Sequence, residues 1–547
     1  MVRRKPMAML ATFIVAALLL SAAVACGGGG KKATPTPEPS VTPGGTPTAT
    51  AAPLVDTIDL STQSPSFTAY GADAADLSGG HQTVAAADFN GDDRLDFLIG
   101  APQADGPDND RQDAGEAYVI FGSDDAPDSL DLAQNEPDLK ILGASPGDSL
   151  GRTALAADLN ADGIDDVIVG APGVTAEPDP RTDQGRVYVF FGSRNLKGTI
   201  DLAEGDSGFD FVVTGAEGFS RLGDALASGD VNGDDITDLV LGAPFAGREP
   251  GTRPGSPRKE AGEVYAIFGS ADISGEVNIA FDAPDFQVSA EQRFGQLGAA
   301  VAVGDINGDG IDDVIAGAYQ MDIGDKTDAG ALYAFFGAKD LSGRRFIDKK
   351  EYDFAAIGAD AGDALGIPLA SADVNGDGVD DIVAGARTGD ALENARPAGG
   401  EAYVMFGGDA LGGELDLAAE QSDVTIYGPD NSYLVPTALS VADVNSDGEA
   451  DIILTTSIGP RERLGAGAVY IVHGGVDLKG TADLASPPYR FALVGADPND
   501  RLGAAMAAAP EDEATALLLV ASDADGLDNK RADAGEVYLV SLPKEAQ

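Results

Sequence analysis

The sequence predicts an all-β fold, a seven-bladed β-propeller of four-stranded blades, and three repeated patterns support this prediction. Asp-rich loops begin at six places about 70 residues apart. Each loop is followed by a short apolar run such as FLIGAP, VIVGAP or LVLGAP. Segments similar to AYVIFG occur seven times, at 117–122, 187–192, 264–269, 332–337, 402–407, 469–474 and 537–542. Repeats of this length are typical of propeller blades, because a single thin sheet cannot bury a core without neighbours.

Each repeat is predicted to contain four strands separated by Gly- and Asp-rich turns. The repeating region covers residues 56–547. It begins with the segment 66–71, which matches an outermost strand, and it ends with a third strand that no fourth strand follows. We therefore predict that 66–71 completes the last blade, since this removes an open sheet edge. In the third repeat the predicted strands are 225–230, 238–244, 264–269 and 285–290.

The first 55 residues are predicted to be an export signal followed by a tether. Residues 3–5 are basic, residues 7–25 are apolar, and Cys26 ends the apolar run, which together indicate a signal peptide over residues 1–26. The residues around Cys26 resemble a bacterial lipobox, so we expect lipidation of Cys26. An uncleaved membrane span is the alternative, because the run is long enough to cross a bilayer. Residues 27–55 are rich in Gly, Pro and Thr, as in a tether. Either interpretation anchors the chain at a membrane, with the rest at the cell surface or facing the periplasm.

The composition narrows the possible functions. Asp and Glu number 90 against 35 Lys and Arg, a formal net charge of −55, which excludes binding to a phosphate backbone such as that of a nucleic acid. One cysteine cannot form an internal disulfide. The apolar fraction of 43% is enough for a large core. We expect the tyrosines of the AYVIFG-like segments in that core rather than on a surface that stacks against sugars.

The six Asp-rich loops have the donor chemistry of calcium sites. In the first loop, side-chain oxygens come from Asp88, Asn90, Asp92 and Asp96, and the carbonyl of Arg94 supplies another. Ca²⁺ takes about six to eight oxygen ligands, and carboxylates this close repel one another without a cation. The sequence therefore predicts about six Ca²⁺ sites. The equivalent residues in the other loops are Asp158, Asn160, Asp162, Ile164 and Asp166; Asp230, Asn232, Asp234, Ile236 and Asp238; Asp305, Asn307, Asp309, Ile311 and Asp313; Asp373, Asn375, Asp377, Val379 and Asp381; and Asp443, Asn445, Asp447, Glu449 and Asp451.

Two details distinguish the loops from one another. Four loops have Gly at the sixth position, which permits a sharp turn, whereas Asp93 and Asp235 stand there in the other two and are expected to bend less readily. A seventh segment keeps the loop length but has Ala508, Pro510 and Ala516 in place of ligands, so we expect no metal in that blade.

Phe-Gly and Gly-Ala-Pro motifs around D-x-N-x-D-G-x-x-D loops resemble the FG-GAP repeats of the integrin α-subunit propeller. The resemblance covers essentially all of residues 56–547. It implies a seven-bladed propeller with calcium in the loops between the first and second strands of a blade. It also implies that ligands bind at the opposite face, although no ligand-binding motif is matched residue by residue.

The sequence offers little for catalysis. His473 occupies a position that is Phe in most repeats, which favours a packing role. His81 has no Ser or acid at a spacing that suggests a catalytic triad, and Cys26 lies outside the repeats. We therefore expect a protein that is not an enzyme.

One loop stands out as a candidate binding surface. Residues 245–260 form the longest link between a second and a third strand, and they contain Arg248, Arg253, Arg258 and Lys259. A basic loop on an acidic chain can attract an acidic partner, although a solvated flexible loop is an equal alternative. The predicted function is a surface-anchored, calcium-binding module that binds a protein or another surface in adhesion. A structural or assembly component of the cell envelope, and a carboxylate-based hydrolase, remain as alternatives.

Overall fold

The chain divides into two units, residues 1–50 and 51–547, and all the described residues belong to the second. The computed structural model describes residues 57–543 except 74–75, 77–81, 124–126, 176–182, 206–207, 217, 248–259, 293, 420, 461–462, 487–490, 511–513, 527–530 and 532. The predicted signal peptide, Cys26 and the tether lie outside this range. Among the described residues, no helix has the length and apolar character needed to cross a membrane.

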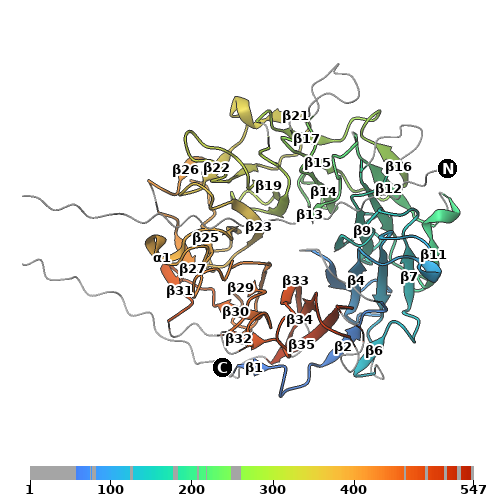
Figure 1. The fold of residues 1–547 in the computed structure, drawn as a ribbon. Helices are drawn as coiled ribbons and strands as arrows, with labels where there is room; N and C mark the ends of the chain where they lie inside the picture. Colours follow the sequence, from blue (N-terminus) through green and yellow to red (C-terminus); the bar gives the residue numbers. More distant parts are fainter. Residues whose placement is uncertain are drawn as a thin grey trace, which may run out of the picture. The chain divides into compact units, whose positions relative to one another are not determined.

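The second unit consists of seven sheets around a common centre, as Figure 1 shows. The innermost strand of each sheet contacts that of the next, and β33 contacts β3, so the ring closes. The innermost strands are β3 (Val84–Ala87), β8 (Thr153–Ala157), β13 (Ala225–Gly229), β18 (Ala300–Gly304), β23 (Leu365–Ala372), β28 (Leu439–Ala442) and β33 (Leu502–Pro510). The second strands are β4 (Asp96–Ala101), β9 (Asp166–Ala171), β14 (Asp238–Ala243), β19 (Asp313–Ala318), β24 (Asp381–Ala386), β29 (Asp451–Thr456) and β34 (Ala514–Ala521).

The outer strands of each blade continue the antiparallel order. The third strands are β5 (Glu116–Ile120), β10 (Arg186–Phe190), β15 (Glu263–Ile267), β20 (Ala331–Phe335), β25 (Glu401–Met405), β30 (Ala468–Val472) and β35 (Glu536–Pro543). The fourth strands are β7 (Leu139–Leu142), β12 (Phe211–Thr214), β17 (Phe286–Ser289), β22 (Phe354–Ile357), β27 (Val424–Tyr427), β32 (Phe491–Val494) and β2 (Phe67–Tyr70). The short helices are η1 (Pro107–Asn109), η2 (Leu202–Glu204), η3 (Ile347–Lys349) and α1 (Ala391–Asn394).

The two ends of the repeating region share one sheet. Strand β2, near the N-terminus, pairs antiparallel with β35, with Phe67 opposite Leu539 and Tyr70 opposite Glu536. This pairing fits the predicted closure of the last blade by residues 66–71. It leaves β35 with a partner on both sides, because β34 pairs with its other edge.

Each sheet also has a fifth strand that the sequence did not lead us to expect. The link between the third and fourth strands of one blade adds a short parallel strand to the edge of the preceding blade. A basic residue of the receiving blade pairs with the last Asp of this strand in five sheets, as Arg396 does with Asp483 at 2.6 Å. The added strands are β11 (Gly198–Asp201), β16 (Gly275–Asn278), β21 (Gly343–Phe346), β26 (Gly413–Asp416), β31 (Gly480–Asp483), β1 (Ile58–Asp59) and β6 (Ser129–Asp131).

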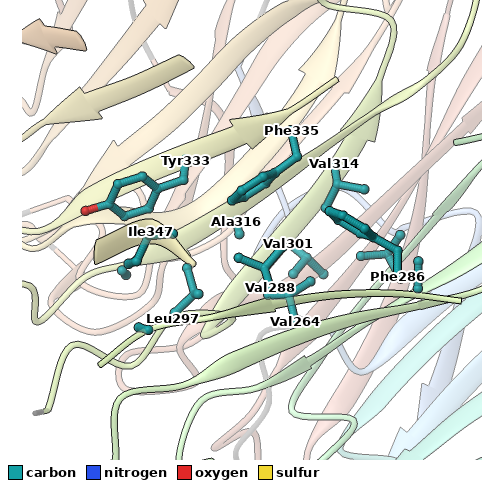
Figure 2. Packing of buried hydrophobic residues seen from close by; sticks show 14 of the residues in the cluster. Val264, Phe286, Val288, Leu297, Val301, Val314, Ala316, Tyr333, Phe335 and Ile347 are labelled. Carbon is teal, nitrogen blue, oxygen red and sulfur yellow. The ribbon is translucent and has the colours of Figure 1, made fainter. Parts of the chain in front are cut away.

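The hydrophobic core lies between adjacent blades. The six fully described second strands are buried along their whole length, because both faces of each sheet are covered by neighbouring sheets. Figure 2 shows one such layer, in which Val264 and Phe286 of one blade pack against Val314 and Phe335 of the next. The tyrosines of the seven AYVIFG-like segments are all buried, as predicted: Tyr118, Tyr188, Tyr265, Tyr333, Tyr403, Tyr470 and Tyr538.

Candidate functional site

Each of the six Asp-rich loops connects the first and second strands of its blade, so all six lie at the same end of the strands. In the first loop, the Asp88 carboxylate accepts hydrogen bonds from the backbone N–H groups of Gly91 at 2.7 Å, Asp92 at 3.1 Å and Asp93 at 2.7 Å. The Asp92 carboxylate accepts one from the N–H of Arg94 at 3.1 Å. The first carboxylate therefore organises the loop by drawing its N–H groups inward. All three bonds to the first Asp recur at Asp230, Asp305, Asp373 and Asp443, and the two from the fifth and sixth residues recur at Asp158.

The turn itself requires two residues in the left-handed region. Gly91 has a φ of +71° and Asp93 a φ of +64°, and Asp235 has +65°. Asp93 and Asp235 thus adopt the left-handed conformation that glycine adopts at this position in the other four loops. Asp tolerates this conformation better than most residues do, because its short polar side chain can hydrogen-bond locally.

The ninth residue of each loop is a fully buried aspartate that joins three parts of the blade. Asp96 is 0% exposed and accepts hydrogen bonds from the N–H of Phe89 at 3.0 Å and the N–H of Gly122 at 2.8 Å. Gly122 is the glycine of the Phe-Gly motif that follows the third strand. A Cβ at that position would lie 2.4 Å from the carbonyl oxygen of Leu95, which explains the glycine. The same bond joins Asp166 to Gly192, Asp238 to Gly269, Asp313 to Gly337, Asp381 to Gly407 and Asp451 to Gly474.

Burial and nearby carboxylates raise the pKa values of Asp96, Asp166, Asp238, Asp313 and Asp381. Loss of solvent, with a smaller contribution from the charges of Asp88 and Asp92, raises the pKa of Asp96 to about 7. The same causes raise the pKa of Asp313 to about 8. The pKa values of Asp166, Asp238 and Asp381 are likewise raised to about 7.

Adjacent loops are also joined around the ring. Asp312, the eighth residue of its loop, accepts a hydrogen bond from the N–H of Asp230 in the preceding blade at 2.9 Å. Asp380 does the same for Asp305 at 3.2 Å. This link was not predicted, because the eighth position varies from loop to loop and gave no pattern in the sequence.

The side chains predicted to bind Ca²⁺ share their loops, but they do not form a finished cage. In the part of the chain that the structure describes, no group of three Asp, Glu, His or Cys side chains is placed to hold a metal ion. The first and ninth carboxylates of each loop are instead directed at N–H groups. The donor set is all oxygen, which fits the preference of Ca²⁺ in kind.

Two further positions differ from their sequence interpretation. His473, directly after β30, lies 3.1 Å from the Asp451 carboxylate and 3.3 Å from the Asn445 amide, so it contacts the sixth loop. In the seventh blade, Ala508 and Ala509 pair with Leu517 and Ala516 in a continued strand ladder, where the other blades have the loop.

The predicted partner-binding residues cannot be placed. Arg248, Arg253, Arg258 and Lys259 all lie outside the described residues, and so does His81. The rim opposite the Asp-rich loops is instead described through other residues. Arg152, Arg221 and Asp224 meet there at the mouth of a central cavity, and none of them had a signal in the sequence.

Comparison with known families agrees with this geometry. The FG-GAP repeat model matches residues 82–120, 150–190, 222–267, 297–335, 369–405 and 435–472, each spanning an innermost strand, an Asp-rich loop and the two strands after it. The chain therefore contains six FG-GAP repeats. The matches account for six blades, and the seventh is the blade in which the loop is replaced by a strand ladder.

Two curated relatives show how far the similarity to known FG-GAP proteins extends. The chain is 32% identical over 216 residues to the phosphatidylinositol-glycan-specific phospholipase D of Bos taurus, a match covering 39% of this chain and 24% of that protein. It is 29% identical over 269 residues to integrin alpha pat-2 of Caenorhabditis briggsae, covering 46% and 19% respectively. The matched segments thus span a quarter or less of these relatives.

A solved structure, the exotype rhamnogalacturonan lyase YesX, aligns over 90% of this chain and 76% of its own, with 12% identity and a TM-score of 0.33. A likeness this low carries no argument about function.

Proposed function

We propose that this FG-GAP propeller is an exported binding module, held at a membrane through Cys26 or an N-terminal span, and stiffened by Ca²⁺ in its rim loops. The observation that carries the proposal is the recurrence of one loop in six blades, each with aspartates at its first, fifth and ninth positions. The similarity to integrin α chains supports a binding role over a catalytic one. The phospholipase D match gives no support for catalysis by this chain, since it covers 24% of that enzyme.

The residues present fit Ca²⁺ in kind, since every donor is an oxygen. In the first loop, the ion would be held by the side chains of Asp88, Asn90, Asp92 and Asp96 and by the Arg94 carbonyl. A carboxylate offers about four lone-pair sites, so Asp92 and Asp96 can accept their hydrogen bonds and still bind a cation. The ion would supply positive charge where the loop carries an excess of carboxylates.

The role of this chain's own residues is to hold the loops rigidly at the rim. The buried ninth aspartate ties each loop to the third strand, and Asp312 and Asp380 tie one loop to the next. A stiff rim keeps the opposite face in one shape, which lowers the entropic cost of binding a partner there.

A capture experiment tests the binding role. The full chain, presented on a lipid surface in calcium, is expected to retain one specific protein or surface ligand, and chelator is expected to reduce that retention. Retention that does not respond to calcium would contradict the stiffening role. Absence of any specific ligand would favour a structural role in the envelope.

A further inference from the structure

The centre of the ring contains a cavity at the end opposite the Asp-rich loops. Its volume is about 470 Å³, within the range of small-molecule sites. The wall is formed by innermost strands and by residues that directly precede them, such as Arg152 and Asp224, and by residues after second strands, such as Phe245 and Tyr319. These positions place the mouth at the rim where second and third strands are joined.

The cavity mouth carries positive charge on a very acidic protein. Arg221 donates a hydrogen bond to the Asp224 carboxylate at 3.0 Å, and its guanidinium lies 5.5 Å from the centre of the Phe245 ring. Arg152 approaches the same carboxylate at 3.7 Å, beyond hydrogen-bond distance. Two guanidinium groups therefore share one carboxylate, against a formal net charge of −55 for the chain.

The Asp224 carboxylate does not fully compensate these cations. Its side chain is 12% exposed, and the Arg152 side chain is 32% exposed. Burial, with the adjacent charge of Arg221, lowers the pKa of Arg152 even though Asp224 acts in the opposite direction. A second anion beside Arg152 would relieve both effects, since a guanidinium offers five N–H donors in a fork that matches a carboxylate.

Polar and apolar side chains share the rest of the cavity, with Gln82, Gln296 and Ser440 among the polar ones. At the repeat position of Arg152 and Asp224, the next two blades have Ala299 and Ile367. Leu439 and Met506 continue this wall through the sixth and seventh blades. The charged lining residues are thus confined to the second and third blades, and the opposite wall presents mainly apolar side chains.

We propose that this cavity binds a carboxylate carried on a small apolar body, with Arg152 and Arg221 holding the carboxylate and the Ile367, Leu439 and Met506 wall covering the body. The inference rests on the proposed binding function and names the ligand chemistry. The carboxylate can come from a free organic acid or from a glutamate side chain of a partner protein.

The test uses calorimetry on the full chain in saturating calcium. The probes are 4-phenylbutyrate, its neutral analogue 4-phenylbutanamide, and the capped peptide acetyl-Leu-Glu-Phe-amide. We expect one 4-phenylbutyrate site per chain and no measurable site for the amide. Tighter binding of the peptide than of 4-phenylbutyrate identifies a protein source, and weaker binding identifies a free acid.

Three variants separate this site from general charge effects. Arg152→Gln is expected to weaken 4-phenylbutyrate binding about tenfold, the usual effect of losing a charged hydrogen bond. Asp224→Asn is expected to strengthen it, because the competing carboxylate is removed. Lys197→Gln removes an equal charge at an exposed position elsewhere and is expected to change nothing.

The melting temperature shows that each variant is folded. Equal binding of the acid and the amide, equal effects of Arg152→Gln and Lys197→Gln, or weaker binding in Asp224→Asn would overturn the inference. So would failure of both carboxylate probes to bind the folded chain. If partner capture persists while the probes fail, only this inference is lost, and the proposed binding function stands.

Discussion

Replacing the buried ninth aspartate of one loop tests whether that residue holds the blade together. In the third blade, Asp238 is 0% exposed and accepts N–H bonds from Val231 at 3.0 Å, Asn232 at 3.2 Å and Gly269 at 2.9 Å. Asp238→Ala leaves these three donors without their acceptor. Each buried donor without a partner costs about 1–3 kcal/mol, so we expect a loss of about 3–9 kcal/mol in the free energy of unfolding.

The matched variants separate this role from calcium binding. All measurements use urea unfolding in chelator, followed by tyrosine fluorescence because the chain has no tryptophan. Asp238→Asn keeps one acceptor oxygen and is expected to lose about half as much stability. Asp230→Asn, at the first position of the same loop, is expected to lose only about 1 kcal/mol, since water can replace its exposed bonds. A loss below about 1 kcal/mol in Asp238→Ala would refute the argument that this aspartate anchors the loop.

Three other predictions follow from the same contacts. In chelator, the melting temperature is expected to fall as the pH rises from about 5 to 8. The reason is that the pKa values of Asp96, Asp166, Asp238 and Asp381 are raised to about 7 in the folded chain, and that of Asp313 to about 8. The protonated carboxyl groups stabilise the folded chain fully below the ordinary carboxyl pKa, and this stabilisation is lost as the groups ionise. A melting temperature that rises over this range would contradict the raised pKa values. Arg396→Met removes two hydrogen bonds to Asp483, at 2.6 and 3.0 Å, and should lower the free energy of unfolding in urea by about 1–3 kcal/mol. The control Lys350→Met, at a more exposed pair with Glu414, should lower it by less than about 1 kcal/mol. Equal losses would show that the Arg396–Asp483 pair does not hold the fifth strand in place. Deleting residues 57–70 exposes the edge of β35, so it should lower the melting temperature and promote association between chains, measured by light scattering. An unchanged melting temperature and unchanged light scattering would contradict the closure of the last blade by β2.

Much of the fold could be predicted because the repeat signals the structure redundantly. The strand-loop-strand order, the seven blades and the pairing of β2 with the last blade all follow from the register of the AYVIFG-like segments. The fifth strands could not be predicted in the same way, since segments such as GTID at 198–201 are short and largely exposed. Their repeated Asp, which pairs with Arg or Lys of the preceding blade, is the pattern that could have identified them.

The candidate site was predictable in part. The sequence identified the loop carboxylates as one set, but it could not separate their tasks. The first aspartate folds the loop and the ninth binds the third strand, and only the burial and hydrogen bonds distinguish them. Arg152, Arg221 and Asp224 gave no signal because the three residues come from two blades and meet only in the folded ring.

Calcium titration of the full chain by calorimetry, with melting in excess calcium and in chelator, tests the central claim most directly. The account predicts binding at about six sites and a large rise in melting temperature, because an ion that binds only the folded chain stabilises it. Variants such as Asp92→Asn should each remove one site. Little binding and an unchanged melting temperature would mean that the Asp-rich loops are turns held by their own hydrogen bonds, and calcium would have no part in this propeller.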